Sequence, residues 1–161
     1  MISKIKELML EQESVVVFDI DGVLFPYEFG EYNHNFSPDS KWQEYLKSNR
    51  PYEHMRPLTS LQKWMIRKDN NKNLFVCSVA SGKDESEQKK KAVMSNYPIQ
   101  EDNFYFVDSK KEKLEALKKI QSLYPGLEDK KIIMVDDSID VLTYIQENSN
   151  YSTAHISTFL Q

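Results

Sequence analysis

The side chains of this sequence that could do chemistry follow short apolar segments of the chain. They are carboxylates, one hydroxyl and a group of lysines: Asp19, Asp21, Ser78, Lys110, Lys111, Lys113, Asp136 and Asp137. Carboxylates that converge at neutral pH repel one another unless a cation lies among them. Oxygen ligands without a nearby cysteine or histidine favour a hard ion, of which Mg²⁺ is the natural choice. With a lysine and a hydroxyl beside it, such a site would suit a phosphoryl group whose phosphorus one carboxylate attacks.

Four apolar segments are predicted to be the β-strands that position these side chains. They are rich in β-branched and aromatic residues and do not alternate with polar ones: residues 15–18, 74–77, 104–107 and 132–135. Such runs are typical of strands covered on both faces, as in a parallel sheet. In an open parallel sheet, ligands bind beyond the carboxyl ends of the strands. The polar residues that follow the four segments are therefore expected to meet at one edge.

Amphipathic helical patterns lie between the predicted strands. Their apolar positions are Ile2, Ile5, Leu8 and Met9; Leu58, Leu61, Met65 and Ile66; Leu114, Leu117 and Ile120; and Val141, Leu142 and Ile145. Two pairs have the spacing of a capping box and are expected to open helices: Asp84 with Glu87, and Ser109 with Glu112. A short last strand is predicted at residues 154–156. Strands that alternate with helices predict a three-layer, Rossmann-like α/β fold, with a parallel sheet covered by helices on both faces.

The segment of residues 22–49 departs from this alternation. It has one short helical pattern, after Asp39, and many aromatic rings: Phe25, Tyr27, Phe29, Tyr32, Phe36, Trp42 and Tyr45. We interpret it as a minimal cap insertion, a lid or substrate loop, within a single domain of residues 1–161. The alternative is that the rings complete the hydrophobic core, which is the stronger expectation for any single ring.

The composition of the chain excludes several classes of protein. Hydrophobic residues make up 40% and charged residues 29% of the sequence, which is typical of a globular domain and not of a disordered chain. A net charge of -4 is too balanced for nucleic acid or an acidic membrane to be the main partner. No segment resembles a membrane span or a signal peptide, so a cytoplasmic protein is expected. Cys77 is expected to be a buried thiol, and most clustered lysines, among them residues 89–91, to lie on solvated helix faces.

Residues 15–24, VVVFDIDGVL, resemble the first motif of the haloacid dehalogenase-like superfamily, an apolar strand followed by Asp-x-Asp-Gly. Ser78 after its apolar segment resembles the second motif, and Asp136 with Asp137 resembles the fourth. The motifs occur in the order of the family and span nearly the whole chain. The dehalogenases of the superfamily lack the second aspartate, and its ion-pumping ATPases have threonine there. Asp21 therefore makes the sequence similar to the phosphatase and phosphomutase branch.

The third motif of the family is a lysine near the start of the helix that precedes the fourth motif. Lys113 is the first choice, because residues 113–117, KLEAL, have the family's pattern of a lysine followed by apolar positions. Lys110 is the second choice, and it lies closer to the end of the preceding segment, as does Lys111.

The resemblance implies a Mg²⁺-dependent phosphohydrolase that acts on phosphate monoesters. It implies that Asp19 forms an aspartyl-phosphate, and that Asp21 protonates the leaving oxygen and then helps to activate water. Ser78 and the lysine would bind the phosphoryl oxygens. The metal ligands would be Asp19, Asp21 through its backbone carbonyl, Asp136 and, directly or through water, Asp137.

The substrate is expected to be a small phosphorylated compound, bound by a monomer or a small homo-oligomer. A faint similarity to the 5′-nucleotidases of the superfamily makes a nucleotide one candidate. Tyr27 would then stack on a base, and Arg50 and Arg56 would hold a phosphate. The alternative is that the two arginines are ordinary surface residues, with Arg56 at a helix start.

Two alternatives come from other classes of protein. A signalling receiver domain also has an acidic pair, a phospho-accepting aspartate and a lysine, but its remaining strands should follow the pair. Too few residues follow Asp137 for that order, which excludes a receiver domain. A catalytically silent binding or regulatory protein on the same fold stays open as the alternative function, although every motif position is filled.

Overall fold

The apolar segments of the sequence form strands that lie between two layers of helices. Residues 15–18, 74–78 and 132–136 are buried there, whereas residues 104–107, at the edge of the sheet, are half-buried. The structure, a computed structural model, describes residues 3–28 and 38–160. Its sheet has five parallel strands in the order β3-β2-β1-β4-β5. They are β1 (Val15–Phe18), β2 (Leu74–Val79), β3 (Phe104–Val107), β4 (Ile132–Asp136) and β5 (Ser152–His155). The predicted α/β fold with a parallel sheet is confirmed, and the short last strand is present.

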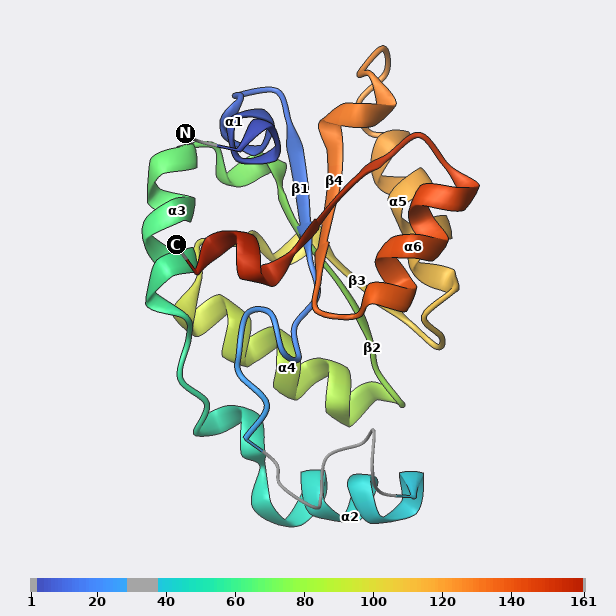
Figure 1. The fold of residues 1–161 in the computed structure, drawn as a ribbon. Coiled ribbons are helices and arrows are strands. Elements are labelled where there is room, and N and C mark those ends of the chain that lie inside the picture. Colours follow the sequence, from blue (N-terminus) through green and yellow to red (C-terminus); the bar gives the residue numbers. More distant parts are fainter. Residues whose placement is uncertain (1–2, 29–37, 161) are drawn as a thin grey trace.

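Helices cover both faces of the sheet (Figure 1). One layer consists of α1 (Lys4–Leu10), α3 (Thr59–Lys68) and α4 (Lys83–Asn96), and the other of α5 (Glu112–Gln121) and α6 (Ile139–Asn148). Val16 and Phe18 of β1 are buried in the first layer, and Val15 and Val17 in the second. The three-layer prediction is therefore confirmed. Among the described helices, of which α4 is the longest with 14 residues, none has the length and apolar character to cross a membrane.

The starts of two helices differ from the sequence-based expectations. Neither predicted capping box forms, because α4 begins after Gly82 and α5 after Lys111, and no side chain caps either helix. Asp84 and Glu112 lie in the first turns, where an acidic side chain still interacts favourably with the helix dipole. At α6, Ser138 is the cap, and its hydroxyl accepts the N–H of Val141. In α3, Ile66 does not belong to the buried stripe, since it is 73% exposed.

The segment of residues 22–49 begins with a tight turn in which Ile20 O accepts the N–H groups of three residues that follow. Phe29, Tyr32 and Phe36 of the predicted lid lie outside the described residues. The helix predicted after Asp39 is present as α2 (Asp39–Asn49), beyond the carboxyl edge of the sheet (Figure 1). Of the described rings, Phe25 and Trp42 are in the core, whereas Tyr27 is 38% exposed. A role of this segment as a lid stays a prediction.

Candidate active site

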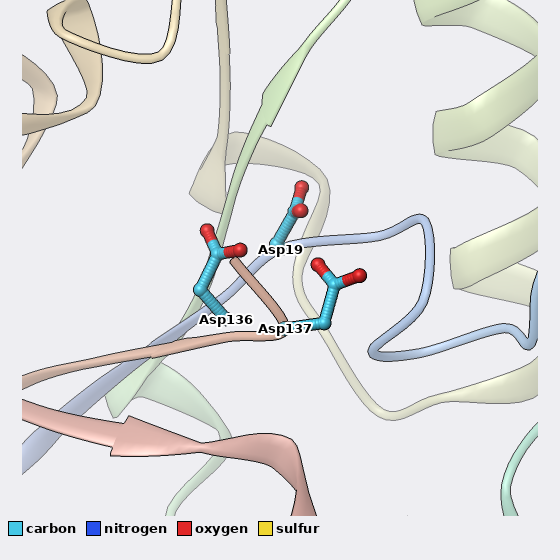
Figure 2. A group of neighbouring side chains, drawn as sticks. All are labelled: Asp19, Asp136 and Asp137. Carbon is cyan, nitrogen blue, oxygen red and sulfur yellow. The ribbon is translucent and has the colours of Figure 1, made fainter. Parts of the chain in front are cut away.

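Three carboxylates meet at the carboxyl edge of β1 and β4. Asp19 follows β1, Asp136 is the last residue of β4, and Asp137 follows it. Because β1 and β4 are neighbours, with Phe18 opposite Val135, the next residues of both strands lie side by side. One oxygen from each carboxylate lies within 4.8 Å of the others (Figure 2). The topology thus brings together the carboxylates that the sequence analysis selected as metal ligands.

The ammonium of Lys113 lies between two of these carboxylates. Its Nζ is 2.7 Å from Asp136 Oδ2 and 3.3 Å from Asp19 Oδ2. Burial would lower the pKa of Lys113, but the two carboxylates raise it by more, so the side chain stays charged. Of the three lysines considered for this position, Lys113 is therefore the one at the carboxylates. Lys110 lines a cavity that opens beside these carboxylates, whereas the Lys111 ammonium lies 5.9 Å from the ring centre of Tyr144.

The carboxylates of this group have raised pKa values because they are buried together. Burial raises the pKa of Asp19 to about 6, Lys113 opposes the rise, and Asp136 and Asp21 add to it. Burial is also the main cause of the raised pKa values of Asp136 and Asp137. Three carboxylates carry more negative charge than one lysine offsets, so a further cation would stabilise their ionised forms. Their all-oxygen donor set fits a hard divalent ion.

A cavity of about 250 Å³ opens beside these carboxylates. Eight of the candidate residues from the sequence line it: Asp19, Asp21, Tyr27, Ser78, Lys110, Lys113, Asp136 and Asp137. Ser78 is buried at the end of β2, with its Oγ 3.5 Å from the Nζ of Lys89. The cavity therefore presents carboxylates, a hydroxyl and ammonium groups to one small space, as a phosphoryl group requires.

Two residues proposed for substrate binding do not line this cavity. The Arg50 guanidinium pairs with Glu53, at 2.6 Å from Nε to Oε1, and lies 4.0 Å from Asp84. Arg56 is exposed and is not among the described residues that line the cavity. Of the three residues on which the nucleotide hypothesis depends, the structure brings only Tyr27 to the cavity.

Gly22 allows the loop after β1 to approach the acidic pair. Its φ is +76°, in the left-handed region that side chains disfavour. A Cβ at this position would lie 2.7 Å from Tyr27 Cε2 and even closer to Asp137 Oδ2. The absence of a side chain at residue 22 is therefore what lets Asp137 and Tyr27 border the same cavity.

Sequence reasoning missed a second buried lysine beside the site. Lys89 was expected among the solvated lysines, but it is 1% exposed, and its Nζ is 2.8 Å from Asp21 Oδ2. The hydroxyl of Tyr52 donates a hydrogen bond to Asp21 Oδ1 at 2.6 Å. A signal was present: Glu85 and Lys89 share a helix face with the apolar Ala92, at the spacing of a buried stripe. The carboxylate of Asp21 thus lies with these groups, not in the group of three carboxylates.

Replacing Gly22 with alanine should disrupt the cavity and not only the turn. We expect Gly22→Ala to weaken divalent-cation binding at least about tenfold, because the new methyl group displaces Asp137 and Tyr27. Gly126→Ala is the matched control, since Gly126 also has positive φ, at +83°, but meets nothing within 4 Å. Both variants should lose about 1–2 kcal/mol of stability from backbone strain. Calorimetric titration with Mg²⁺ measures the difference, and equal affinities in the two variants would contradict the role of Gly22.

The raised pKa of Asp19 should make the metal-free protein less stable at neutral than at mildly acidic pH. The pKa is 3.8 ordinarily and about 6 in the folded protein, so the folded state binds more protons between these values and stability falls as pH rises through them. From about pH 5 to about pH 7.5, the loss attributable to Asp19 should be about 1–2 kcal/mol.

Urea unfolding with EDTA at both pH values measures this loss in the wild type and in Asp19→Asn. Because Asp136 and Asp137 have raised pKa values as well, the variant should keep part of the pH dependence. An identical pH dependence in both proteins would show that Asp19 does not contribute.

The chain resembles solved proteins in structure. No protein-family model matches the sequence, and no curated protein matches it. The chain superposes on the protein named DsGPDH of Dunaliella salina with a TM-score of 0.58 and 18% identity, over 94% of this chain and 25% of that one. It superposes on a haloacid dehalogenase-like hydrolase of Burkholderia xenovorans with a TM-score of 0.55 and 13% identity, over 88% of this chain and 80% of that one.

The chain spans a quarter of the length of the first of these proteins and most of the second. At such low identities the likeness concerns the fold. The structure matches that of a haloacid dehalogenase-like hydrolase, in agreement with the motifs at Asp19, Ser78 and Asp136. This protein therefore shares its three-layer α/β fold with that hydrolase.

Proposed function

We propose that this protein is a Mg²⁺-dependent phosphohydrolase that cleaves phosphate monoesters through an aspartyl-phosphate on Asp19. One observation carries the proposal: Asp19 borders a small cavity together with the hydroxyl of Ser78, two lysines and three further aspartates. This combination of a nucleophile, cationic groups and a metal-binding donor set is what phosphoryl transfer needs.

Asp19, Asp136 and Asp137 would hold the Mg²⁺, with the backbone carbonyl of Asp21 as a further ligand. When bound, the ion neutralises phosphoryl oxygens and orients the phosphate for in-line attack. The charge balance supports this assignment, because Lys113 alone does not offset the three carboxylates.

In the first step, a carboxylate oxygen of Asp19 attacks phosphorus and forms a P–O bond. The bond from phosphorus to the leaving oxygen breaks, its electron pair stays on that oxygen, and Asp21 in its acid form supplies a proton. Ser78 Oγ donates a hydrogen bond to the phosphoryl group, and Lys113 and Lys110 offset its negative charge. The products of this step are the free alcohol and the aspartyl-phosphate.

In the second step, a water molecule attacks the same phosphorus. Asp21 accepts a proton from the water, the bond between phosphorus and the Asp19 oxygen breaks, and inorganic phosphate is released. Asp19 returns to its carboxylate form, so the cycle consumes one water per ester. The proximity of Asp19 and Asp21, both at the wall of one cavity, supports this division of roles.

The substrate we propose is a small phosphate monoester. A cavity of about 250 Å³ is somewhat smaller than most small-molecule sites, so part of the substrate would lie at its mouth, near Tyr27. A nucleotide stays one candidate through that ring alone, because neither Arg50 nor Arg56 lines the cavity. A panel of nucleoside monophosphates, sugar phosphates and phosphopeptides distinguishes these classes.

The direct test is Mg²⁺-dependent release of phosphate from para-nitrophenyl phosphate. Asp19→Asn should reduce kcat by about a thousandfold or more, because it removes the nucleophile. Asp108→Asn is the matched control, since Asp108 also follows a strand at this edge but is exposed and does not belong to the carboxylate group. EDTA should abolish turnover and added Mg²⁺ should restore it.

Absence of turnover in well-folded protein with every substrate of the panel would contradict the proposal. If that protein still bound Mg²⁺ and a phosphate mimic, the alternative of a silent binding or regulatory protein would replace it. Unchanged turnover in Asp19→Asn would overturn the assignment of Asp19 as the nucleophile, but it would not contradict the proposed phosphohydrolase activity.

A further inference from the structure

Both oxygens of the Asp21 carboxylate are contacted by donors from elsewhere in the chain. Oδ1 accepts the hydroxyl of Tyr52 at 2.6 Å, and Oδ2 lies 2.8 Å from the ammonium of Lys89. Tyr52 belongs to the short helix η2 (Pro51–Glu53), and Lys89 to the middle of α4. All three side chains are buried. Tyr52 and Lys89, which have no role in the proposed chemical steps, therefore restrain the orientation of this carboxylate.

The ammonium of Lys89 is itself held in place. It donates a hydrogen bond to the backbone carbonyl of Val79 at 2.7 Å and lies 3.5 Å from Glu85 Oε2. Glu85 accepts the indole N–H of Trp42 and the backbone N–H of Ser81. Lys89 is thus the centre of a buried network that joins α2, α4 and the end of β2 to Asp21.

Such a network is a costly way to fill a protein interior. Removing charged groups from water costs several kcal/mol per ion, and well-packed apolar residues of similar volume often give equal or greater stability. Burial lowers the pKa of Lys89, but Asp21 and Glu85 raise it by more, so the charged form is kept. A role in the site accounts for a buried ammonium at this position better than stability does.

We propose that Lys89 and Tyr52 are positioning residues that orient the Asp21 carboxylate for proton transfer at the wall of the cavity. The inference rests on the proposed function, to which it adds two residues that the family motifs do not include. Both contacts come from donors, so the two groups orient the carboxylate form, which is the form that accepts a proton from water in the second step.

Orientation matters because a general base acts only within hydrogen-bond reach of the proton it accepts. Without Lys89 and Tyr52, the Asp21 carboxylate would lose two contacts that restrain its orientation toward the water. General acid–base catalysis contributes about 10²–10⁴-fold, so partial loss of orientation should cost a measurable share of that factor. The helices α2 and η2, which contain Trp42 and Tyr52, would then support Asp21 in this orientation.

The experiment compares Lys89→Met and Tyr52→Phe with the wild type on para-nitrophenyl phosphate in rapid-mixing kinetics. Slower hydrolysis of the aspartyl-phosphate should lower kcat about tenfold or more in Lys89→Met, and less in Tyr52→Phe. The value of kcat/KM should change less than about threefold, because nitrophenolate leaves without a proton. A burst of nitrophenolate should precede the slow steady state. Lys91→Met is the matched control, because Lys91 is an exposed lysine of the same helix, and it should behave as wild type.

A second comparison asks whether Lys89 acts through Asp21. In an Asp21→Asn background, Lys89→Met should change kcat less than about twofold, because the group that it positions is gone. Equal losses in kcat and kcat/KM without a burst, or an undiminished loss in the Asp21→Asn background, would overturn the inference and show a structural role. If Lys89→Met does not fold, as judged by circular dichroism, Tyr52→Phe carries the same test, because it removes only one hydroxyl.

The two proposals fail in different ways. Wild-type turnover that is lost in Asp19→Asn supports the proposed function whatever Lys89→Met does, so a negative result for Lys89 overturns the positioning role alone. A wild-type protein that turns over no substrate overturns both.

Discussion

The buried ion pairs of Lys113 with Asp19 and Asp136 are the interaction on which the carboxyl edge of the sheet depends. Adjacent parallel strands place Asp19 and Asp136 side by side, and two buried carboxylates at that separation repel each other strongly. The ammonium from α5, at 3.3 and 2.7 Å from them, offsets that repulsion. The same charges that would hold a metal therefore also bear on the pairing of β1 with β4, so this site and the fold are electrostatically linked.

The sheet and its acidic edge could be predicted because their signals are local in the sequence. A run of apolar residues such as Val15–Phe18 identifies a buried strand, and the residue after it must lie at the carboxyl edge whichever strands are neighbours. Asp19 and Asp136 could therefore be placed at the same edge without knowledge of the strand order, and the pairing of β1 with β4 is what brings them side by side. The family resemblance selected Lys113 among nearby lysines, and the structure puts its Nζ at the two carboxylates.

The surroundings of Asp21 could not be predicted in the same way, because they depend on contacts between distant elements. Asp21 and Tyr52 are 31 residues apart, and nothing in either local sequence indicates that they meet. Lys89 stands in a run of three lysines, which favours a solvated face when composition alone is considered. Its burial depends on the rotation of α4, which the apolar Ala92 and Val93 set. Arg50 was selected because it follows an aromatic segment, and its contact could not be predicted either: its guanidinium pairs with Glu53, and it does not line the cavity.

The two faces of the sheet each supply one buried ammonium to the loop after β1. Lys113 comes from α5 on one face and lies against Asp19, whereas Lys89 comes from α4 on the other face and lies against Asp21. Two carboxylates so close in the chain would otherwise compete for one cation, and each would raise the pKa of the other. Because Asp19 and Asp21 have separate cationic partners, their surroundings differ. Asp19 lies beside the carboxylates that could bind a metal, and Asp21 is contacted by Lys89 and Tyr52. The proposed division into a nucleophile and a proton-transfer group would use this asymmetry, which the three-layer fold supplies because its central strand has helices on both sides.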